Sequence, residues 1–581
     1  MSDPLKSTAE ASSSDRGLRT IAKAAPSPRR KPKHDQFWGR GEPMVWVAGG
    51  TLAAILLGAI TMLVVLLANG LTYFWPSRLE ELQLADGRCV LGRRVSSVGD
   101  SKNSNDFPFR TANKGFDPKT QAIQRIKRSD VVASTSPLEA VMVERMENSD
   151  FYGFFAEVRA PDLDVPAGDA SIGQLQDALR KMAACRSREL DPLLRQISSI
   201  SDRHEAAHNA QLRLIQRKET IESATPSAQE EIAVLTGKIG ELQAEIAALD
   251  RESGDHVAER SNLETRLRKN VAVFHDREGK SRSIALLDII RAYQPNAMGF
   301  GGKVGHYITK VWELLSTPPR ESNTEGGLLP ALFGTVTLIF LMAICSFPLG
   351  VLAGIYLGEY AQDGVLVRLV RIGVNNLAGI PSIVYGIFGL GFFVSYLGSH
   401  IDRALFAQQL SNGPVFGTGG VLWAALTLGL LTVPVVIVAT EEAIRVIPRG
   451  VRESSYALGA TKFQTLVRVT IPLASPGMLT GFILAMARAA GEVAPLMLTG
   501  VVSSAATLPL DGKFPYFHLE RQFMHLGYQI YSVLFQSPDA EAARPLVYVI
   551  ALLLVLIVLA PSGVAIYLRN RMRKTLQIRT I

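Results

Sequence analysis

The chain has 581 residues, of which 47% are hydrophobic and 20% charged, and its formal net charge is +8. A soluble chain of this length would spread its apolar residues over several domains, whereas here they gather in long runs. A basic total in a membrane-spanning chain is more often a topology signal than a footprint of nucleic-acid binding, so no nucleic-acid partner is expected.

Six apolar runs are long enough to be membrane-spanning helices, each of which needs about 20 predominantly apolar residues. The expected fold class is therefore an all-α polytopic membrane protein with a large insert between the first and second spans. The first run is longer than the apolar stretch of about 7–15 residues in a signal peptide, which predicts an uncleaved anchor. We place the spans near residues 44–72, 327–357, 372–398, 418–440, 473–500 and 546–568.

The distribution of basic residues predicts the topology. The leader 1–43 and the tail 569–581 are both rich in Lys and Arg, which places both ends in the cytoplasm. Six spans return the chain to its starting side, and the Arg-rich loop 441–472 is then also cytoplasmic. The insert, residues 73–326, is expected on the opposite face. The Ser-, Ala-, Pro- and Arg-rich leader cannot bury much apolar surface and is expected to be disordered.

The insert has two parts in its sequence. Residues 76–165 alternate turn clusters such as ADGR and NKGFDP with short β-prone runs, which predicts a β-rich or α+β unit. Residues 170–270 have a helical period and are expected to form an antiparallel hairpin with a coiled-coil seam. The seam consists of Ile232, Leu235, Ile239, Leu242, Ile246 and Leu249. A structural stalk and a partner-docking or sensing arm both fit this pattern.

Two of the three cysteines, Cys89 and Cys185, fall in the insert, and Cys345 falls in the second span. A disulfide between Cys89 and Cys185 is possible if the insert is exported. Their wide separation in the sequence leaves the pairing open.

The loop 441–472 is patterned like a structured element. Pro448 and Gly450 interrupt it, residues 451–457 suit a short helix, Gly459 ends that helix, and Thr461 suits the cap of a second one. Two short helices joined at a glycine form a compact projection that can seat in a groove of another protein. An amphipathic turn lying on the membrane is the alternative.

The end of this loop carries a family signature. The stretch Glu453-Ser454-Ser455-x3-Gly459-x9-Val469-x-Ile471-Pro472 resembles the E-A-A-x3-G-x9-I-x-L-P signature of ABC importer permeases. Two serines replace the two alanines, and Val469 and Ile471 replace Ile and Leu. The resemblance implies that this loop, with Ala460 and Phe463, docks on a nucleotide-binding subunit.

Other segments narrow the resemblance. The run from Gly326 to Tyr360 looks like the opening transmembrane segment of a type I permease core. NNLAGIPSIVYGIFGL, YALGATKFQ and MARAAGEVAPLMLTG look most like the PstA-type permease of the phosphate importer, in its long proteobacterial variant with a large insert. This resemblance implies a multi-pass protein of the bacterial inner membrane, in contact with membrane lipids, that forms half of a pathway for inorganic phosphate. The implied partners are a PstC-type permease, a PstB-type ATPase dimer and a periplasmic PstS-type binding protein.

The chain has no Walker A pattern, no zinc-ligand cluster and no nucleophile elbow. We therefore expect no catalytic residue, no metal and no cofactor bound by this chain, and ATP is used by the partner ATPase. Two other functions remain open. They are a type I permease for another oxyanion or small solute, and a membrane-anchored coiled-coil sensor or scaffold.

Two charges stand inside the predicted fifth span, Arg488 and Glu492. An arginine at the middle of a spanning helix costs about 2.5–3.5 kcal/mol on insertion scales. A spacing of four residues places both side chains on one helix face, where they can form a salt bridge that packs the bundle. The alternative hypothesis is that Arg488 lines the pathway and offers an oxyanion its planar fork of donors, while Glu492 holds the arginine when the path is empty.

Overall fold

The computed structural model describes residues 42–578 with internal gaps, so residues 1–41 of the predicted disordered leader, together with Pro226 and Arg579, lie outside the described residues. The gaps are 96–104, 112, 114–122, 164–170, 225–228, 278, 321–322, 324, 408–409, 411–412, 506, 513–515 and 538–539. Contacts divide the chain into two units, residues 1–64 and residues 65–581. The described part of the first unit is helix α2 (Glu42–Thr72) as far as Val64, and its large apolar side chains are exposed.

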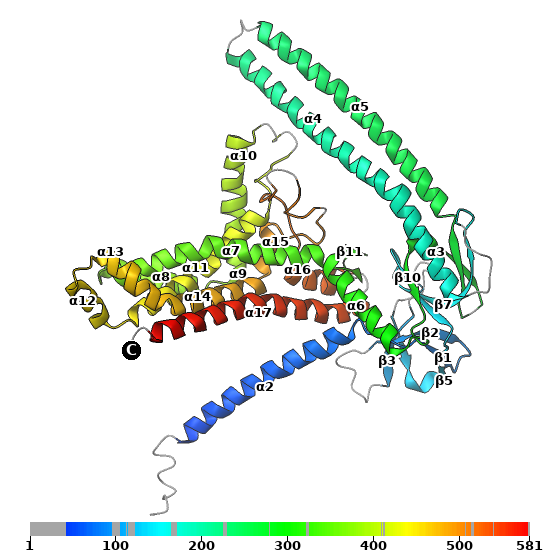
Figure 1. Ribbon diagram of the computed structural model, residues 1–581, viewed down its shortest axis with the longest axis horizontal. Coiled ribbons are helices and arrows are strands. Elements are labelled where there is room, and N and C mark those ends of the chain that lie inside the picture. Colours follow the sequence, from blue (N-terminus) through cyan, green and yellow to red (C-terminus); the bar gives the residue numbers. More distant parts are fainter. Residues whose placement is uncertain are drawn as a thin grey trace, which may run out of the picture. The chain divides into compact units, whose positions relative to one another are not determined.

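Within the described residues, six helices are long and apolar enough to cross a membrane, which confirms the predicted number and the polytopic fold class. Figure 1 shows most of them as a bundle of long helices. Their bounds are Met44–Thr72, Leu329–Tyr360, Ser382–Leu405, Val421–Arg445, Lys462–Gly491 and Ala543–Lys574.

The predicted start of the third span at residue 372 is wrong. Helix α8 (Val365–Leu377) ends before Pro381, and the span begins with α9 (Ser382–Phe388). A proline lacks a backbone N–H and disfavours helical geometry in the residue before it, so the two helices cannot run together. Helix α9 then continues through residues 389–398 into α10 (Ser399–Leu405).

The centre of the bundle depends on a close approach between α7 (Leu329–Ile355) and α11 (Val421–Arg445). A Cβ atom added at Gly354 would lie 2.5 Å from Cβ of Thr440, and one added at Gly350 would lie 2.6 Å from Cβ of Val436. Small residues at helix interfaces let two backbones approach in this way. Helices α14 (Ile471–Gly491) and α17 (Ala540–Ile578) complete the bundle.

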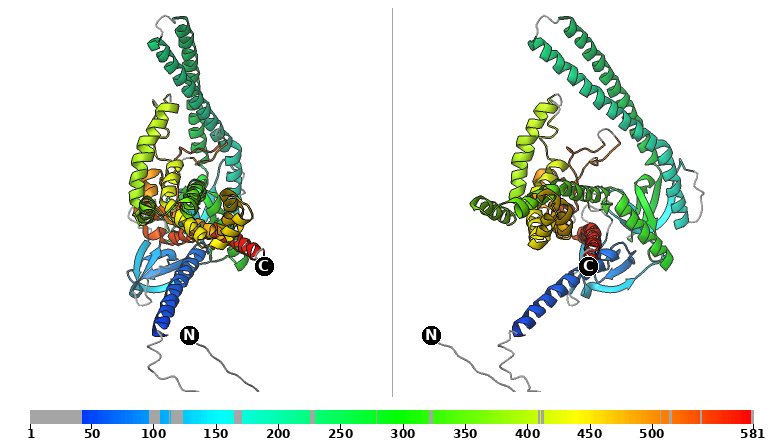
Figure 2. Two further views of the ribbon diagram at one scale, coloured as in Figure 1. Left: turned by 90° about the vertical axis from the view of Figure 1, so that its left-hand side faces the viewer. Right: turned by 60° about the vertical axis from the view of Figure 1, so that its left-hand side comes forward.

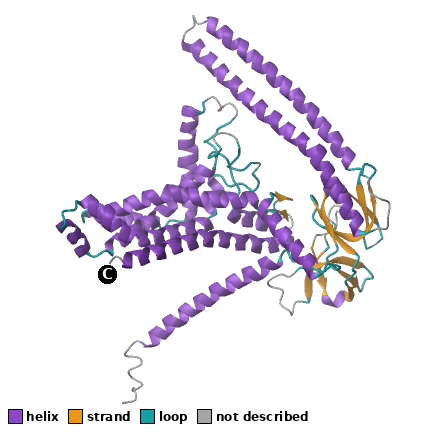
Figure 3. Cartoon of the chain, in the orientation of Figure 1, coloured by secondary structure: helices purple, strands orange, loops and turns teal. Residues whose placement is uncertain are grey.

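The strands gather in the insert (Figure 3), where the described residues form two antiparallel five-stranded sheets and a two-stranded sheet of β11 (Pro319–Arg320) and β12 (Glu325–Gly326). The first has the order β4-β3-β2-β1-β5, and the second has the order β10-β6-β7-β8-β9. The strands of the first sheet are β1 (Glu80–Leu84), β2 (Cys89–Arg94), β3 (Asp106–Arg110), β4 (Ile123–Lys127) and β5 (Val131–Thr135). Those of the second are β6 (Ala140–Arg145), β7 (Phe151–Arg159), β8 (Val271–His275), β9 (Ser281–Ala285) and β10 (Ile289–Tyr293).

The second sheet contains strands from both sides of the helical region. Strands β6 and β7 precede the helical region in the chain, and β8 to β10 follow it. Helix α3 (Ile172–Cys185) starts at the cap residue Ser171 and packs Leu175, Ala178 and Met182 into the core of this sheet. The α+β character predicted for the insert is therefore present, and the sheet extends to residues that the sequence left unassigned.

Helices α4 (Asp191–Ala224) and α5 (Gln229–Leu267) run side by side in both views of Figure 2. Ile200 and Ala207 of α4 pack against Leu249 of α5, with Leu242 and Ile246 alongside. The coiled-coil part of the fold class is thus confirmed.

All three cysteines are free, which contradicts a disulfide between Cys89 and Cys185. Cys89 begins strand β2 of the first sheet, whereas Cys185 ends helix α3, which packs on the second sheet. The Cys185 thiol instead lies 3.5 Å from a carboxylate oxygen of Glu189.

We predict that Gly354→Leu destabilises the bundle, because the new Cβ would lie 2.5 Å from Cβ of Thr440 and 2.8 Å from the carbonyl oxygen of Ile437. Overpacking of this kind costs about 1–3 kcal/mol. The measurement is the thermal unfolding midpoint of the full chain in detergent. Gly373→Leu on α8 is the matched control, because a Cβ there meets nothing within 4 Å. Equal midpoints for the two variants would contradict the prediction.

Candidate functional site

The loop 441–472 folds into two short helices, which we call the helical knob: α12 (Arg449–Ala457) and α13 (Lys462–Thr465). Gly459 joins them at a φ of +84°, which a glycine adopts without steric cost. The Thr461 hydroxyl accepts a hydrogen bond from the Gln464 N–H, and the Gln464 side chain accepts one from the Thr461 N–H. This capping box starts α13, which continues without a break into α14.

The predicted coupling residues divide into an exposed and a packed group. Glu453, Ser454, Gly459 and Phe463 are exposed, whereas Ser455, Ala460, Val469, Ile471 and Pro472 are half-buried. The Ser455 hydroxyl lies 2.9 Å from the Thr465 hydroxyl and links the two helices of the knob.

The exposed surface of the knob is partly apolar. Leu458 is 89% exposed and Phe463 is 66% exposed. Large apolar side chains that face solvent together are typical of a protein contact surface. Sequence analysis missed Leu458, although its place beside the helix-ending Gly459 is the signal that could have found it.

Ion pairs connect the knob to the end of the second span. The Arg452 Nε atom lies 3.3 Å from a carboxylate oxygen of Glu359, and its guanidinium donates to the Ile444 carbonyl at 2.7 Å. Lys462 lies over the Tyr360 ring, 4.5 Å from its centroid. Burial leaves only 5% of the Glu359 side chain exposed. These partners are far apart in the sequence, so no local pattern indicated them.

A second ion-pair group lies on the neighbouring helices. Glu441 of α11 accepts from Arg371 of α8 at 2.8 Å and from Arg445 at 2.7 Å. Arg371 also contacts Asp363 at 3.1 Å and donates to the Leu357 carbonyl at 3.2 Å. The start of α8 is thereby fastened to α11 and to the end of the second span.

The predicted continuous span 473–500 is wrong, and the error changes the setting of Arg488 and Glu492. Helix α14 ends at Gly491, Glu492 has extended backbone geometry, and a separate helix α15 (Ala494–Thr499) follows. Pro495 explains the break, because its ring would clash with the carbonyl of Gly491 in a continuous helix. Arg488 therefore lies in the last turn of a helix, where the dipole favours a cation.

Arg488 and Glu492 still contact each other, with 3.8 Å between Nε and the nearer carboxylate oxygen. The Arg488 guanidinium also donates to the Ala378 carbonyl at 3.4 Å, which lies in the link between α8 and α9. Both side chains keep partial exposure, 33% for the arginine and 22% for the glutamate. A guanidinium has five N–H groups, so these two contacts leave donors for a further acceptor.

Comparison with known proteins identifies the class of this bundle. Residues 346–574 match the binding-protein-dependent transport system inner membrane component family, and this segment contains the knob and both charges. Residues 346–574 are therefore similar to the membrane components of binding-protein-dependent transport systems. The resemblance to PstA-type permeases is also confirmed, over about a third of the chain.

The curated relatives include the phosphate transport system permease protein PstA 1 of Mycobacterium tuberculosis, which is 37% identical over 186 residues. That alignment covers 32% of this chain and 54% of the relative. PstA of Yersinia pestis is 36% identical over 185 residues, which cover 32% of this chain and 56% of the relative. The chain thus spans about half the length of the curated relatives it matches.

Among solved structures, the inward-facing MetNI methionine ABC transporter is 19% identical, and the match covers 42% of this chain and 95% of that chain with a TM-score of 0.32.

We predict that Arg452→Gln lowers the thermal unfolding midpoint, because it leaves the buried Glu359 carboxylate without its ion pair. Breaking one partner of a buried pair typically costs about 3–5 kcal/mol. Adding Glu359→Gln should restore part of the loss, since the double variant has no unpaired charge. Arg468→Gln, on the exposed side of the same segment, serves as the control. A double variant no more stable than Arg452→Gln alone would refute the ion-pair explanation.

Proposed function

We propose that this chain is a membrane permease subunit of an ATP-driven phosphate importer. The match of residues 346–574 to this family of transport components carries the proposal, and the similarity to PstA proteins supports phosphate as the substrate. The chain forms half of the translocation pathway, and a second, PstC-type permease forms the other half. A PstS-type binding protein delivers inorganic phosphate, and a PstB-type ATPase dimer uses ATP, so this chain is neither an enzyme nor the holder of a cofactor.

The knob is the docking element for the ATPase in this proposal. It belongs on the cytoplasmic side with both chain ends, as the basic residues of the leader, the loop and the tail predict. Leu458 and Phe463 supply the apolar contact, and the ion pair of Arg452 with Glu359 makes the knob rigid.

A continuous helix connects the knob with Arg488. The spanning helix runs from Lys462 to Gly491 over 30 residues, which is about 45 Å at 1.5 Å per residue. A displacement of the knob by the ATPase is therefore transmitted to the last turn of the helix, where Arg488 lies. The helix is continuous between the two ends, with a π-helical turn at Leu466–Thr470 and with Pro472 and Pro476 after it.

At that end, Arg488 contacts phosphate in our proposal. The guanidinium matches two oxygens of the anion at once, which a point charge such as lysine does not. Glu492 lies 3.8 Å away and occupies the arginine when no phosphate is present. Competition between the carboxylate and the substrate keeps binding weak enough for release.

We predict that Arg488→Gln abolishes phosphate uptake into proteoliposomes that contain the whole transporter, while the ATPase subunit still copurifies. The control is Arg403→Gln, which changes an exposed arginine in the last turn of α10. Uptake that survives Arg488→Gln would contradict the pathway role. Parallel assays with sulfate and molybdate test the substrate, because equal transport of all three would favour a general oxyanion permease.

We also predict that Leu458→Asp and Phe463→Asp each release the ATPase subunit without changing the unfolding midpoint of the isolated chain. Both side chains are mostly exposed, so the fold does not depend on them. The measurement is the amount of ATPase that copurifies with the tagged permease. Val234→Asp, at a half-exposed apolar position on α5, is the matched control. Unchanged copurification would exclude the knob as the docking element.

A further inference from the structure

A basic cavity lies where the first spanning helix meets the sheets of the insert. Its volume is about 270 Å³, whereas a single water needs only about 10–15 Å³. Its walls come from the end of α2 and the residues after it, from β2 and β3, and from the beginning of α17. Its lining includes Asn69, Tyr73, Arg93, Arg110 and Tyr548.

Positive charge predominates in the lining of this cavity. Three arginines line it, Arg93, Arg94 and Arg110, and its described lining residues include no Asp or Glu. Arg94 is paired with Glu80 at 2.7 Å. Arg110 is paired with Glu325 at 3.2 Å and with Asp150 at 3.8 Å.

Arg93 differs from the other two arginines. Within the described part of the chain, its side chain makes no hydrogen bond and no ion pair. In the antiparallel pair of β2 and β3, it stands directly opposite Arg110. Like charges in this cross-strand position repel each other. Asp150 favours the charged form of Arg93, but no carboxylate of the described residues forms an ion pair with it, so its guanidinium donors are open to an external anion.

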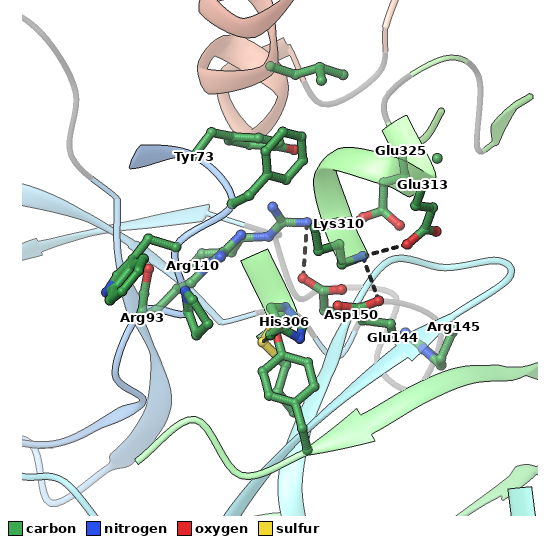
Figure 4. Close-up of a pocket in the computed structure, with 18 of the residues that line it drawn as sticks. Tyr73, Arg93, Arg110, Glu144, Arg145, Asp150, His306, Lys310, Glu313 and Glu325 are labelled. Atoms are coloured by element: carbon green, nitrogen blue, oxygen red, sulfur yellow. Dashed lines mark hydrogen bonds and ion pairs between the residues drawn. The ribbon is translucent and has the colours of Figure 1, made fainter. Parts of the chain in front are cut away.

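The carboxylates of a neighbouring cavity do not fill this role. Figure 4 shows Glu144, Glu313 and Lys310 together on one side, while Arg93 and Tyr73 lie on the other. Lys310 lies 2.6 Å from Glu144 and 3.4 Å from Glu313, so both carboxylates already have a cation. Asp150 acts on Arg93 without an ion pair, because its carboxylate pairs with Arg110, so Arg93 has no ion pair among the described residues.

Tyr73 adds a neutral donor beside the two arginines. It lines both cavities, and its ring lies above Arg110 in Figure 4. Burial raises the pKa of the Tyr73 phenol, so the hydroxyl stays protonated and can donate a hydrogen bond. Two guanidinium groups and a phenol are donors suited to a tetrahedral oxyanion.

The position of the cavity suggests which anions reach it. Asn69 belongs to the end of the first spanning helix and Tyr548 to the last one, so the cavity opens at the membrane surface. Helix α6 (Phe300–Ser316) lies nearby, with 6.0 Å between the rings of Trp75 and Phe300. Phe300 and Trp312 are 76% and 70% exposed, as in the aromatic belts of membrane interfaces.

We propose that Arg93, Arg110 and Tyr73 form a binding site for a phosphate group, separate from the proposed translocation site at Arg488. The phosphate group comes from an anionic lipid head group or from free inorganic phosphate, since both present the same oxygens. Binding joins the residue that follows the first spanning helix to the first sheet of the insert, because Tyr73 comes directly after α2 and both arginines lie in the sheet.

The test uses the full chain in a maltoside detergent, which contains no phosphate. The thermal unfolding midpoint is measured with inorganic phosphate, with phosphatidylglycerol, and with sodium chloride at matched ionic strength. We expect at least one of the two phosphate compounds to raise the midpoint beyond the chloride control. Arg93→Gln should weaken the apparent affinity about tenfold or more, since it removes a charge-assisted hydrogen bond.

Three further variants make the result decisive. Tyr73→Phe keeps the ring and should weaken the response less than Arg93→Gln does. Arg88→Gln changes an exposed arginine on the turn between β1 and β2 and should leave the response intact. Arg488→Gln should also retain it, which separates this site from the proposed uptake function.

A rise of the midpoint with the lipid alone, with phosphate alone or with both identifies the source of the phosphate group. Each of these results supports the site if Arg93→Gln diminishes the rise. The proposal is overturned if neither compound raises the midpoint of the natural chain, or if Arg93→Gln responds as strongly as Arg88→Gln.

Discussion

A charge next to an apolar bundle has to be compensated, and this constraint organises the parts of the protein that bear on function. Arg452 is compensated by Glu359, and Arg371 by Glu441, so the knob and α8 are fastened to the spanning helices. Arg488 has a longer and partly exposed contact with Glu492. Arg93 has no such partner among the described residues. The tightly paired charges support the structure, whereas the loosely paired and unpaired ones are where an anion can bind.

The permease core combines this electrostatic constraint with a geometric one. Gly350 and Gly354 bring α7 close to α11, and the bundle presents α14 as one helix that continues from the knob. Pro495 ends that helix one turn after Arg488. The same proline therefore determines where the transmitted motion stops and places the arginine at a helix end. There the dipole favours its charge, so the cost estimated for an arginine at mid-span does not apply.

Much of this arrangement was open to prediction from the sequence. The six spans follow from apolar runs, the two helices of the knob follow from Pro448, Gly459 and Thr461, and the coiled coil follows from its leucine and isoleucine seam. The misplaced boundaries lie beside Pro381 and Pro495. An apolar run keeps a high mean hydropathy when it contains a proline, although the helix has to end there.

By itself, the sequence determined the number of spanning helices, the knob and the presence of a charged pair in the fifth span. Each of these depends on neighbours within a few residues, because helix period, capping and turn geometry are local. Only the tertiary structure decided which distant charges meet, such as Arg452 with Glu359, and which remain unpaired, such as Arg93 opposite Arg110. It also showed that Cys89 lies in the first sheet, whereas Cys185 ends a helix that packs on the second sheet. Such pairings depend on how sheets and helices pack, which local propensity does not contain.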